Sequence, residues 1–231
     1  MFRELFLAAI LAALCAGLVN SAIQHFRVTP LILHAESFEG EPAGHTDDAA
    51  TPAHTHDNDE WAPQDGLERA AYTVLANLLV AAGFALVIGA VSLLAGLPIT
   101  FANGVVWGVA GFLVFTLAPA FGLAPELPGM PAAEVFPRQV WWWGTVVSTG
   151  AAALLLAKSR SGWALAIAVV LVAAPHLIGA PQPPDEPSAV PAHLATEFAA
   201  VALGTAAVFW IVLGLSFGRL NDWFAANGAR A

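Results

Sequence analysis

The chain has 231 residues, of which 58% are hydrophobic and only 11% are charged, and its formal net charge is −9. Soluble domains usually carry about 25% charged residues, so the composition excludes an ordinary soluble domain and indicates a membrane protein. The acidic balance also argues against nucleic-acid binding, which needs a basic surface. Cys15 is the single cysteine, which excludes an internal disulfide.

Six long apolar stretches predict membrane-spanning helices. They cover residues 4–24, 70–96, 103–123, 140–157, 162–179 and 192–217. Each approaches or exceeds the length of roughly 18 residues expected of a span. Because backbone polar groups in hydrocarbon must be satisfied within the protein, we expect an all-α polytopic helical bundle. One membrane domain should then occupy the whole chain, 1–231.

The first stretch also resembles a signal peptide, because Arg3 precedes an apolar run. The run from Leu5 to Ala22 is long for a signal peptide, and Leu14 stands before Cys15, where a lipoprotein signal has a small residue. We therefore expect a retained helix.

The loop between the first two stretches is the only long polar segment of the sequence. Its apolar content is too low to bury a core, so we expect residues 40–60 to be disordered. Side chains in it that could capture a divalent cation weakly are His54, His56, Asp57, Asp59 and Glu60. Ordering such a loop costs about 1–2 kcal/mol per residue. The alternatives are a solvated acidic loop without metal and a closed zinc site of four ligands.

Polar residues also stand at the ends of later stretches. Glu126 lies in a proline-dense segment, His176 follows Pro175 near the end of the fifth stretch, and His193 and Glu197 are four residues apart on one helical face. Ionisable groups at the edge of a span are candidates for function, so these two histidines and two glutamates could form a cation site at the outer mouth. The alternatives are an exposed acid at Glu126, an interfacial anchor at His176 and a local hydrogen bond between His193 and Glu197.

Arg138 stands just before three consecutive tryptophans, Trp141–Trp143. We interpret the tryptophans as an aromatic belt at the membrane interface. Arg138 could form an ion pair with Glu126 or with Glu134 across a short loop.

The polar residues inside the predicted spans are uncharged. They are Asn20, Ser21, Gln24, Asn77, Ser92, Thr145, Ser148, Thr149 and Thr205. The absence of a mid-membrane carboxylate argues against a proton-coupled antiporter, and the absence of a P-loop motif argues against ATP hydrolysis. The pairs Gly104/Gly108 and Gly214/Gly218 predict close contact between helices.

Lysine and arginine in short loops predict the orientation. Six spans place both termini on one side of the membrane, and that side carries five basic residues against three on the other. We therefore expect cytoplasmic termini. All but two of the 17 acidic residues and all seven histidines then lie on or near the outer side, and such a surface concentrates divalent cations.

Several short motifs occur in a characteristic order. The most specific are Pro-Glu-Leu-Pro-Gly-Met at 125–130 and Pro-His-Leu-Ile-Gly-Ala-Pro at 175–181. Further pieces are Pro30-Leu31-Ile32, Ala35-Glu36, Asp65-Gly66-Leu67-Glu68-Arg69, Leu75-Ala76-Asn77, Ala118-Pro119, Gly122-Leu123, Arg138-Gln139, Trp141-Trp142, Phe209-Trp210 and Leu213-Gly214. Together they span nearly the whole chain, and their order resembles the CbtA family of predicted cobalt transporter subunits.

The resemblance implies an integral membrane protein of bacteria that helps to take up cobalt, typically for cobalamin synthesis. It also implies a small single-helix partner, CbtB, with histidine near one end. We therefore expect a subunit in the bacterial cytoplasmic membrane that transports Co²⁺ or Ni²⁺, has no permanently bound cofactor and is not an enzyme. The alternatives are a membrane metal sensor or assembly partner that does not transport, and a metal-dependent membrane enzyme, for which the sequence offers no recognised catalytic signature.

Overall fold

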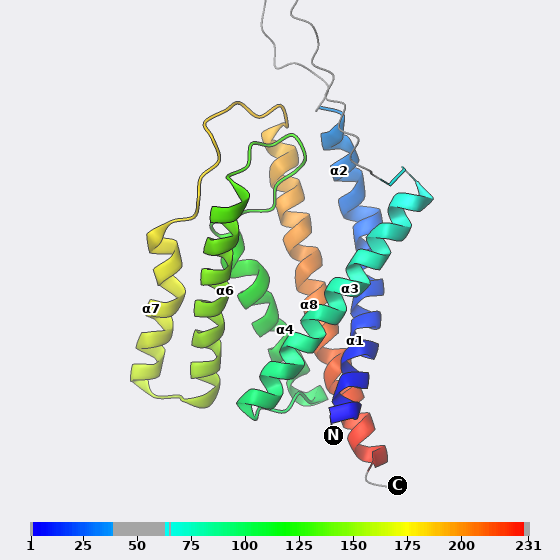
Figure 1. The fold of residues 1–231 in the computed structure, drawn as a ribbon, viewed down its shortest axis with the longest axis vertical. Coiled ribbons are helices and arrows are strands. Elements are labelled where there is room, and N and C mark those ends of the chain that lie inside the picture. Colours follow the sequence, from blue (N-terminus) through cyan, green and yellow to red (C-terminus); the bar gives the residue numbers. More distant parts are fainter. Residues whose placement is uncertain (1, 39–62, 65, 229–231) are drawn as a thin grey trace, which may run out of the picture.

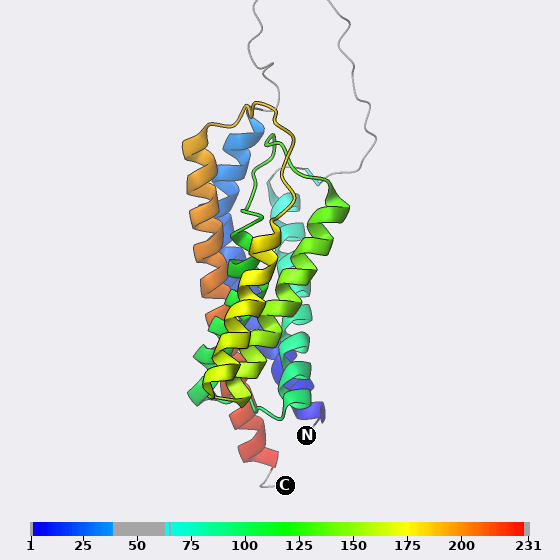
Figure 2. The same cartoon turned by 90° about the vertical axis from the view of Figure 1, so that its left-hand side faces the viewer.

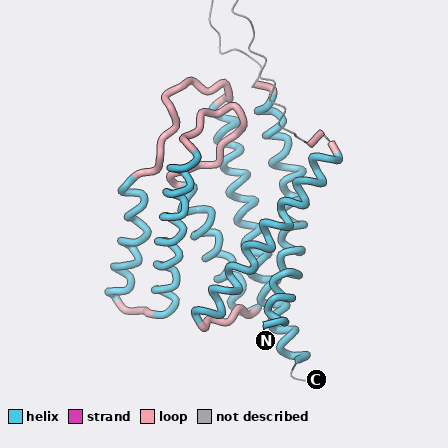
Figure 3. Tube along the Cα trace, viewed as in Figure 1, coloured by secondary structure: helices cyan, strands magenta, loops and turns pink. Residues whose placement is uncertain are grey.

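The structure, a computed structural model, describes residues 2–38, 63–64 and 66–228 of the chain. The segment 40–60, which we expect to be disordered, lies outside the described residues, and so do His54, His56, Asp57 and Asp59. Within the described residues all regular secondary structure is helical (Figure 3). The prediction of an all-α fold is confirmed.

The described helices form six rods that run between the two ends of a bundle (Figure 1). The first rod is continuous from α1 (Phe2–Ile23) through the π-helical turn η1 (Gln24–Val28) to α2 (Thr29–Glu36), and the second is α3 (Leu67–Ala95). The third joins the 3-10 turn η2 (Phe101–Asn103), α4 (Gly104–Phe112), the π-helical turn η3 (Leu113–Leu117) and α5 (Ala118–Ala120). The remaining rods are α6 (Val135–Lys158), α7 (Gly162–Ile178) and α8 (Ala192–Gly228).

Five of these rods are long and apolar enough to cross a membrane. They are Arg3–Glu36, Leu67–Ala95, Phe101–Ala120, Val135–Lys158 and Ala192–Asn227. The sixth rod, Gly162–Ile178, is apolar but shorter, and its 17 residues equal the lower limit of about 17 for a span. The fold is therefore that of a multi-pass membrane protein with five candidate spans, and the sixth span predicted at 162–179 stays a prediction.

Several helices extend beyond the apolar stretches that predict them. The sequence predicts an end near residue 24 for the first span, but the helical rod continues to Glu36. It predicts an end at 217 for the last span, but α8 continues to Gly228. Hydropathy marks the hydrocarbon layer, whereas the i→i−4 hydrogen bonds of a helix can continue into water.

Both ends of the chain lie at one end of the bundle, which we call the terminus end (Figures 1 and 2). The end of α2 and the start of α8 lie at the opposite end, which we call the loop end. Helix α1 packs against both α3 and α8, α4 packs against α8, and α6 and α7 form a hairpin at the side of the bundle. Helix α8 is therefore the element that connects the first and third rods.

A stripe of alanines on α1 lets its neighbours approach closely. Ala8, Ala12 and Ala16 are completely buried and belong to one apolar cluster with Ala81 and Ala85 of α3. Small residues are favoured at such contacts because helices in lipid associate largely through close van der Waals packing.

Glycines bring the backbones of α4 and α8 into contact. A Cβ added to Gly104 would lie 2.6 Å from the carbonyl oxygen of Gly214, and one added to Gly214 would lie 2.7 Å from the backbone nitrogen of Gly108. No side chain fits at this crossing, so the close helix contact predicted from the glycine spacing is confirmed.

We predict that Gly214→Ala lowers the midpoint of thermal unfolding of the detergent-purified protein, because an added methyl group separates α4 from α8 at a cost of about 1–3 kcal/mol. The matched control is Gly204→Ala on the same helix, where an added Cβ meets nothing within 4 Å. The control should keep or raise the midpoint, since alanine is better than glycine in a helix by roughly 1 kcal/mol. Equal midpoints for the two variants would contradict the close contact.

Candidate functional site

Glu126 and Arg138 form an ion pair at the loop end. Arg138 Nη2 donates to Glu126 Oε2 at 2.9 Å, and both side chains are half-buried. Of the two partners that the sequence offers for Arg138, the structure selects Glu126 rather than Glu134. A cation that binds Glu126 must therefore compete with the guanidinium.

His176 lies near the end of α7 among aromatic side chains. Its ring is 5.7 Å from that of Trp141 and 6.2 Å from that of Phe121, both edge-on. The indole Nε1 of Trp141 donates to the carbonyl oxygen of Pro175 at 3.0 Å, and the backbone N–H of Gly179 donates to the same oxygen. Trp141 is thus a buried structural residue that positions the end of α7.

His193 and Glu197 share an exposed face in the first turns of α8, while Leu194 and Phe198 of the same helix are buried. The four predicted outer-site residues lie in three different segments: Glu126 in the loop before α6, His176 in α7, and His193 with Glu197 in α8. Within the described residues, no group of three or more His, Cys, Asp or Glu side chains lies close enough together to hold a metal ion. The four-residue outer site stays a prediction.

A cluster of uncharged polar side chains links α1 and α3 inside the bundle. Asn20 Nδ2 donates to Asn77 Oδ1 at 3.2 Å, and Asn77 Nδ2 donates to Ser21 Oγ at 3.1 Å and to Gln24 Oε1 at 2.9 Å. Ser21 Oγ donates back to the carbonyl oxygen of Gly17 at 2.8 Å. We call Asn20, Ser21, Gln24 and Asn77 the amide cluster.

The sequence contains a signal for the amide cluster. Asn20 and Gln24 are four residues apart, so they lie on the same face of the first helix. A polar amide in an apolar span is costly unless it has a hydrogen-bond partner. These two facts require a polar partner on a neighbouring helix, and Asn77 provides it.

The amide cluster lines a cavity of about 990 Å³, which we call the central cavity. Its walls come from the first rod, α3, η3 and α8. Further polar walls are the hydroxyl groups of Thr73, Thr116 and Thr205, and aromatic walls are Phe84, Phe209 and Trp210. Trp210 Nε1 donates to Thr116 Oγ1 at 3.1 Å, which attaches α8 to η3 beside the cavity.

Both π-helical turns border the central cavity. In η1 the N–H of Thr29 donates to the carbonyl oxygen of Gln24, and in η3 the N–H of Ala118 donates to that of Leu113, each five residues back. Gln24 in the first turn and Thr116 in the second both line the cavity. Single π-helical turns inside α-helices occur frequently at functional sites.

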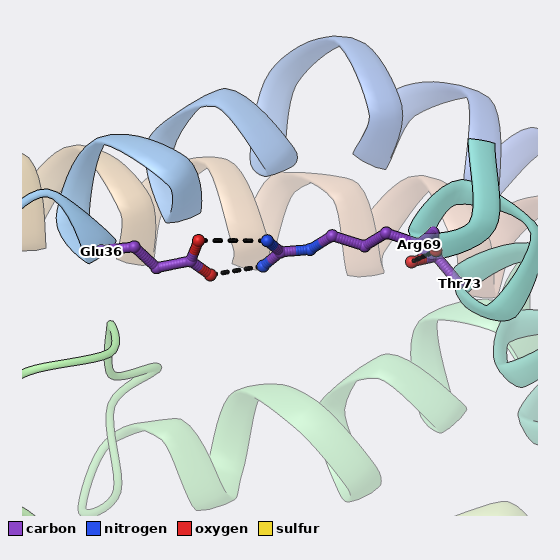
Figure 4. A network of polar contacts seen from close by, with 3 residues as sticks. All are labelled: Glu36, Arg69 and Thr73. Atoms are coloured by element: carbon purple, nitrogen blue, oxygen red, sulfur yellow. Dashed lines mark hydrogen bonds and ion pairs between the residues drawn. The ribbon is translucent and has the colours of Figure 1, made fainter. Parts of the chain in front are cut away.

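An ion pair closes α2 onto α3 at the edge of the central cavity (Figure 4). The pairing is bidentate: Arg69 Nη1 donates to Glu36 Oε2 at 3.0 Å, and Nη2 donates to Oε1. Thr73 Oγ1 donates to the carbonyl oxygen of Arg69 at 2.8 Å. Bidentate arginine–carboxylate pairs fix geometry as well as adding energy, so this pair sets the separation of α2 and α3.

A second cavity of about 510 Å³ lies next to the first. Its polar walls are Glu126, Arg138 and Gln139 at the loop end, and Thr116 lines both cavities. The polar groups of the loop end and the amide cluster therefore lie on two adjoining cavities.

These features define a multi-pass α-helical membrane protein with a cavity between its helices that polar side chains line in part. Residues 2–222 match the family model of the probable cobalt transporter subunit (CbtA), and the chain belongs to this family. The resemblance drawn from the sequence motifs is thereby confirmed. A family of transporter subunits implies that the protein is not an enzyme. No curated protein and no solved structure matches the chain.

We predict that Trp141→Phe lowers the stability of the protein by about 1–3 kcal/mol, because it leaves the buried carbonyl oxygen of Pro175 with one hydrogen bond fewer. Trp143→Phe is the matched control, since the side chain of Trp143 is 58% exposed. Thermal unfolding in detergent measures both effects. A loss for Trp143→Phe as large as that for Trp141→Phe would contradict the structural role of Trp141.

Proposed function

We propose that this chain is the transmembrane subunit of an uptake system for a divalent metal cation, Co²⁺ or Ni²⁺, in the bacterial cytoplasmic membrane. The observation that carries the proposal is the family match over residues 2–222. The polar side chains in the two cavities support it, because an ion needs polar groups to pass through an otherwise apolar bundle.

We propose that the terminus end faces the cytoplasm and the loop end faces the outside. The excess of basic residues at the terminus end supports this orientation. A membrane potential that is negative inside then draws a divalent ion inward by about 4.6 kcal/mol per 100 mV, since one charge gains about 2.3 kcal/mol.

We propose that cation capture begins at two groups of side chains on the outer side. One is the predicted outer-mouth set, His176, His193, Glu197 and Glu126, and the other is the predicted loop set, His54, His56, Asp57 and Asp59. The exposure of the His193/Glu197 face supports capture from solution. Since Glu126 is paired with Arg138, it contributes only when a cation displaces the guanidinium.

The transport system has further components under this proposal. The sequence has no P-loop for ATP hydrolysis, and under this proposal the driving force is the membrane potential. A small single-helix CbtB-like subunit is the expected partner within the bilayer, and the chain itself carries no permanently bound cofactor.

We predict that proteoliposomes containing the full chain take up Co²⁺ when an inside-negative potential is imposed, and that uptake increases when the single-helix partner is included. An encapsulated metal-sensitive dye measures the flux, and protein-free liposomes are the control. Vesicles that stay impermeable to both Co²⁺ and Ni²⁺ with the partner present would contradict transport and favour a sensor or assembly role.

We also predict that the double variant His193→Ala, Glu197→Gln raises the KM for Co²⁺ uptake about fivefold without lowering the maximal rate, because losing a charge-assisted contact costs of order 1 kcal/mol. The matched control is Asp185→Asn, Glu186→Gln, which removes two exposed acids from the same end of the bundle. An unchanged KM in the first variant, or an equal rise in both, would remove His193 and Glu197 from the capture site.

A further inference from the structure

The amide cluster has hydrogen-bonding capacity that the protein does not use. Asn77 donates both hydrogens of its Nδ2 and its Oδ1 accepts from Asn20, so each amide oxygen of the cluster keeps at least one unused lone pair. Asn20 Oδ1 and Gln24 Nε2 have no hydrogen-bond partner among the described residues. Both side chains are half-buried and line the central cavity. Polar groups in an apolar span remain favourable only if something polar satisfies them.

The size of the central cavity suits a hydrated ion. A divalent cation with six waters occupies about 200 Å³, at about 30 Å³ for each water, and the cavity measures about 990 Å³. A bare cation would need six oxygen ligands from the protein if it kept an octahedral shell. Two of the three amide oxygens already accept hydrogen bonds from other amides, so the cluster is too small to replace the whole shell.

The charges around the cavity agree with weak binding of a cation. The cavity lining contains no carboxylate among the described residues, and its one arginine, Arg69, is neutralised by Glu36. The exposed ring of His25 also borders the cavity. Conduction needs a site that holds the ion firmly enough to enter but weakly enough to leave, and neutral oxygens meet this need better than carboxylates.

Aromatic rings line the central cavity on the side nearer the terminus end. Phe84 lies seven residues beyond Asn77 on α3, which is about 10 Å along a helix. The rings of Phe84 and Trp210 are 4.8 Å apart, and those of Phe115 and Trp210 are 5.5 Å apart. The adjoining second cavity, which shares Thr116, leads toward Glu126 at the loop end. Polar side chains of the two adjoining cavities therefore reach from the amide cluster to Glu126 at the loop end, while aromatic side chains line the other side of the central cavity.

We propose that the amide cluster is an intramembrane binding site for a hydrated divalent cation, whose water shell donates hydrogen bonds to the oxygens of Asn20 and Gln24. The site rests on the proposed function as a cation-uptake subunit. The competing explanation is that the cluster only joins α1 to α3, as polar side chains do between helices in lipid.

Two substitutions of Gln24 separate these explanations. Gln24→Met removes the amide and keeps the length of the side chain, while Gln24→Glu keeps an oxygen that can accept from Asn77 and adds a negative charge. If the cluster is a cation site, Gln24→Met binds the cation more weakly and Gln24→Glu binds it more tightly. If the cluster only joins α1 to α3, Gln24→Glu is destabilised by a buried charge and neither variant gains affinity for the cation. Thr145→Val is the matched control, because Thr145 is buried within a span, lines neither cavity and donates its hydroxyl to the carbonyl oxygen of Trp141 at 2.9 Å.

The first measurement is equilibrium binding of hexaamminecobalt(III) to the purified full chain. The ammine shell does not exchange, so this probe binds only through its outer hydrogens, and physiological salt screens exposed acids. We expect the Kd to rise about tenfold in Gln24→Met, equivalent to about 1.4 kcal/mol, to fall in Gln24→Glu and to stay unchanged in Thr145→Val. Shifts of less than about twofold, or in the same direction for both Gln24 variants, would overturn the site.

The second measurement is Co²⁺ uptake in proteoliposomes, with KM and maximal rate determined separately. We expect Gln24→Met to raise the KM, and Gln24→Glu to lower both the KM and the maximal rate because the ion leaves slowly. Wild-type uptake that does not respond to Gln24 overturns the site and leaves the proposed function intact. Binding that follows Gln24 without any wild-type uptake supports the site and overturns the proposed function.

Discussion

Contacts between helices hold this bundle together, because lipid removes the hydrophobic drive that associates helices in water. The side-chain amide of Asn77 makes three hydrogen bonds to the first rod, so its loss would leave several polar groups unpaired in apolar surroundings. Helix α8 is held mainly by close packing. Gly214 lies against the backbone of α4, and α8 also packs against the alanine-rich α1. Both kinds of contact involve helices that line the central cavity.

The interactions that hold the helices also form the walls of the central cavity. The amide cluster joins α1 to α3, and the Glu36–Arg69 pair joins α2 to α3. The Trp210–Thr116 hydrogen bond attaches α8 to the π-helical turn η3. Polar groups in a membrane protein must satisfy one another, and where several do so on different helices the space between them is polar as well. The central cavity therefore offers neutral polar groups and, among its described lining residues, no carboxylate that would trap a cation.

The loop end and the interior have different chemistry. At the loop end the charges are exposed, as at His193 and Glu197, or paired, as at Glu126 and Arg138. In the central cavity the polar groups are mainly neutral amides and hydroxyls. Under the proposed function, charge at the surface raises the local concentration of cations, and neutral oxygens in the interior hold them only briefly. The family to which the chain belongs, described as probable cobalt transporter subunits, is consistent with such a division.

The sequence by itself determined the fold class, the family and the glycine contact between α4 and α8, because hydropathy, short motifs and residue size are local properties. The members of the amide cluster are also recognisable in the sequence as polar residues within apolar spans, but their contacts with one another are not. Only the tertiary structure paired Asn77 with Gln24 across 53 residues of chain, selected Glu126 over Glu134 for Arg138, and turned His193 to an exposed face. These outcomes depend on the rotation and tilt of each helix against its neighbours, which side-chain packing over the whole bundle decides.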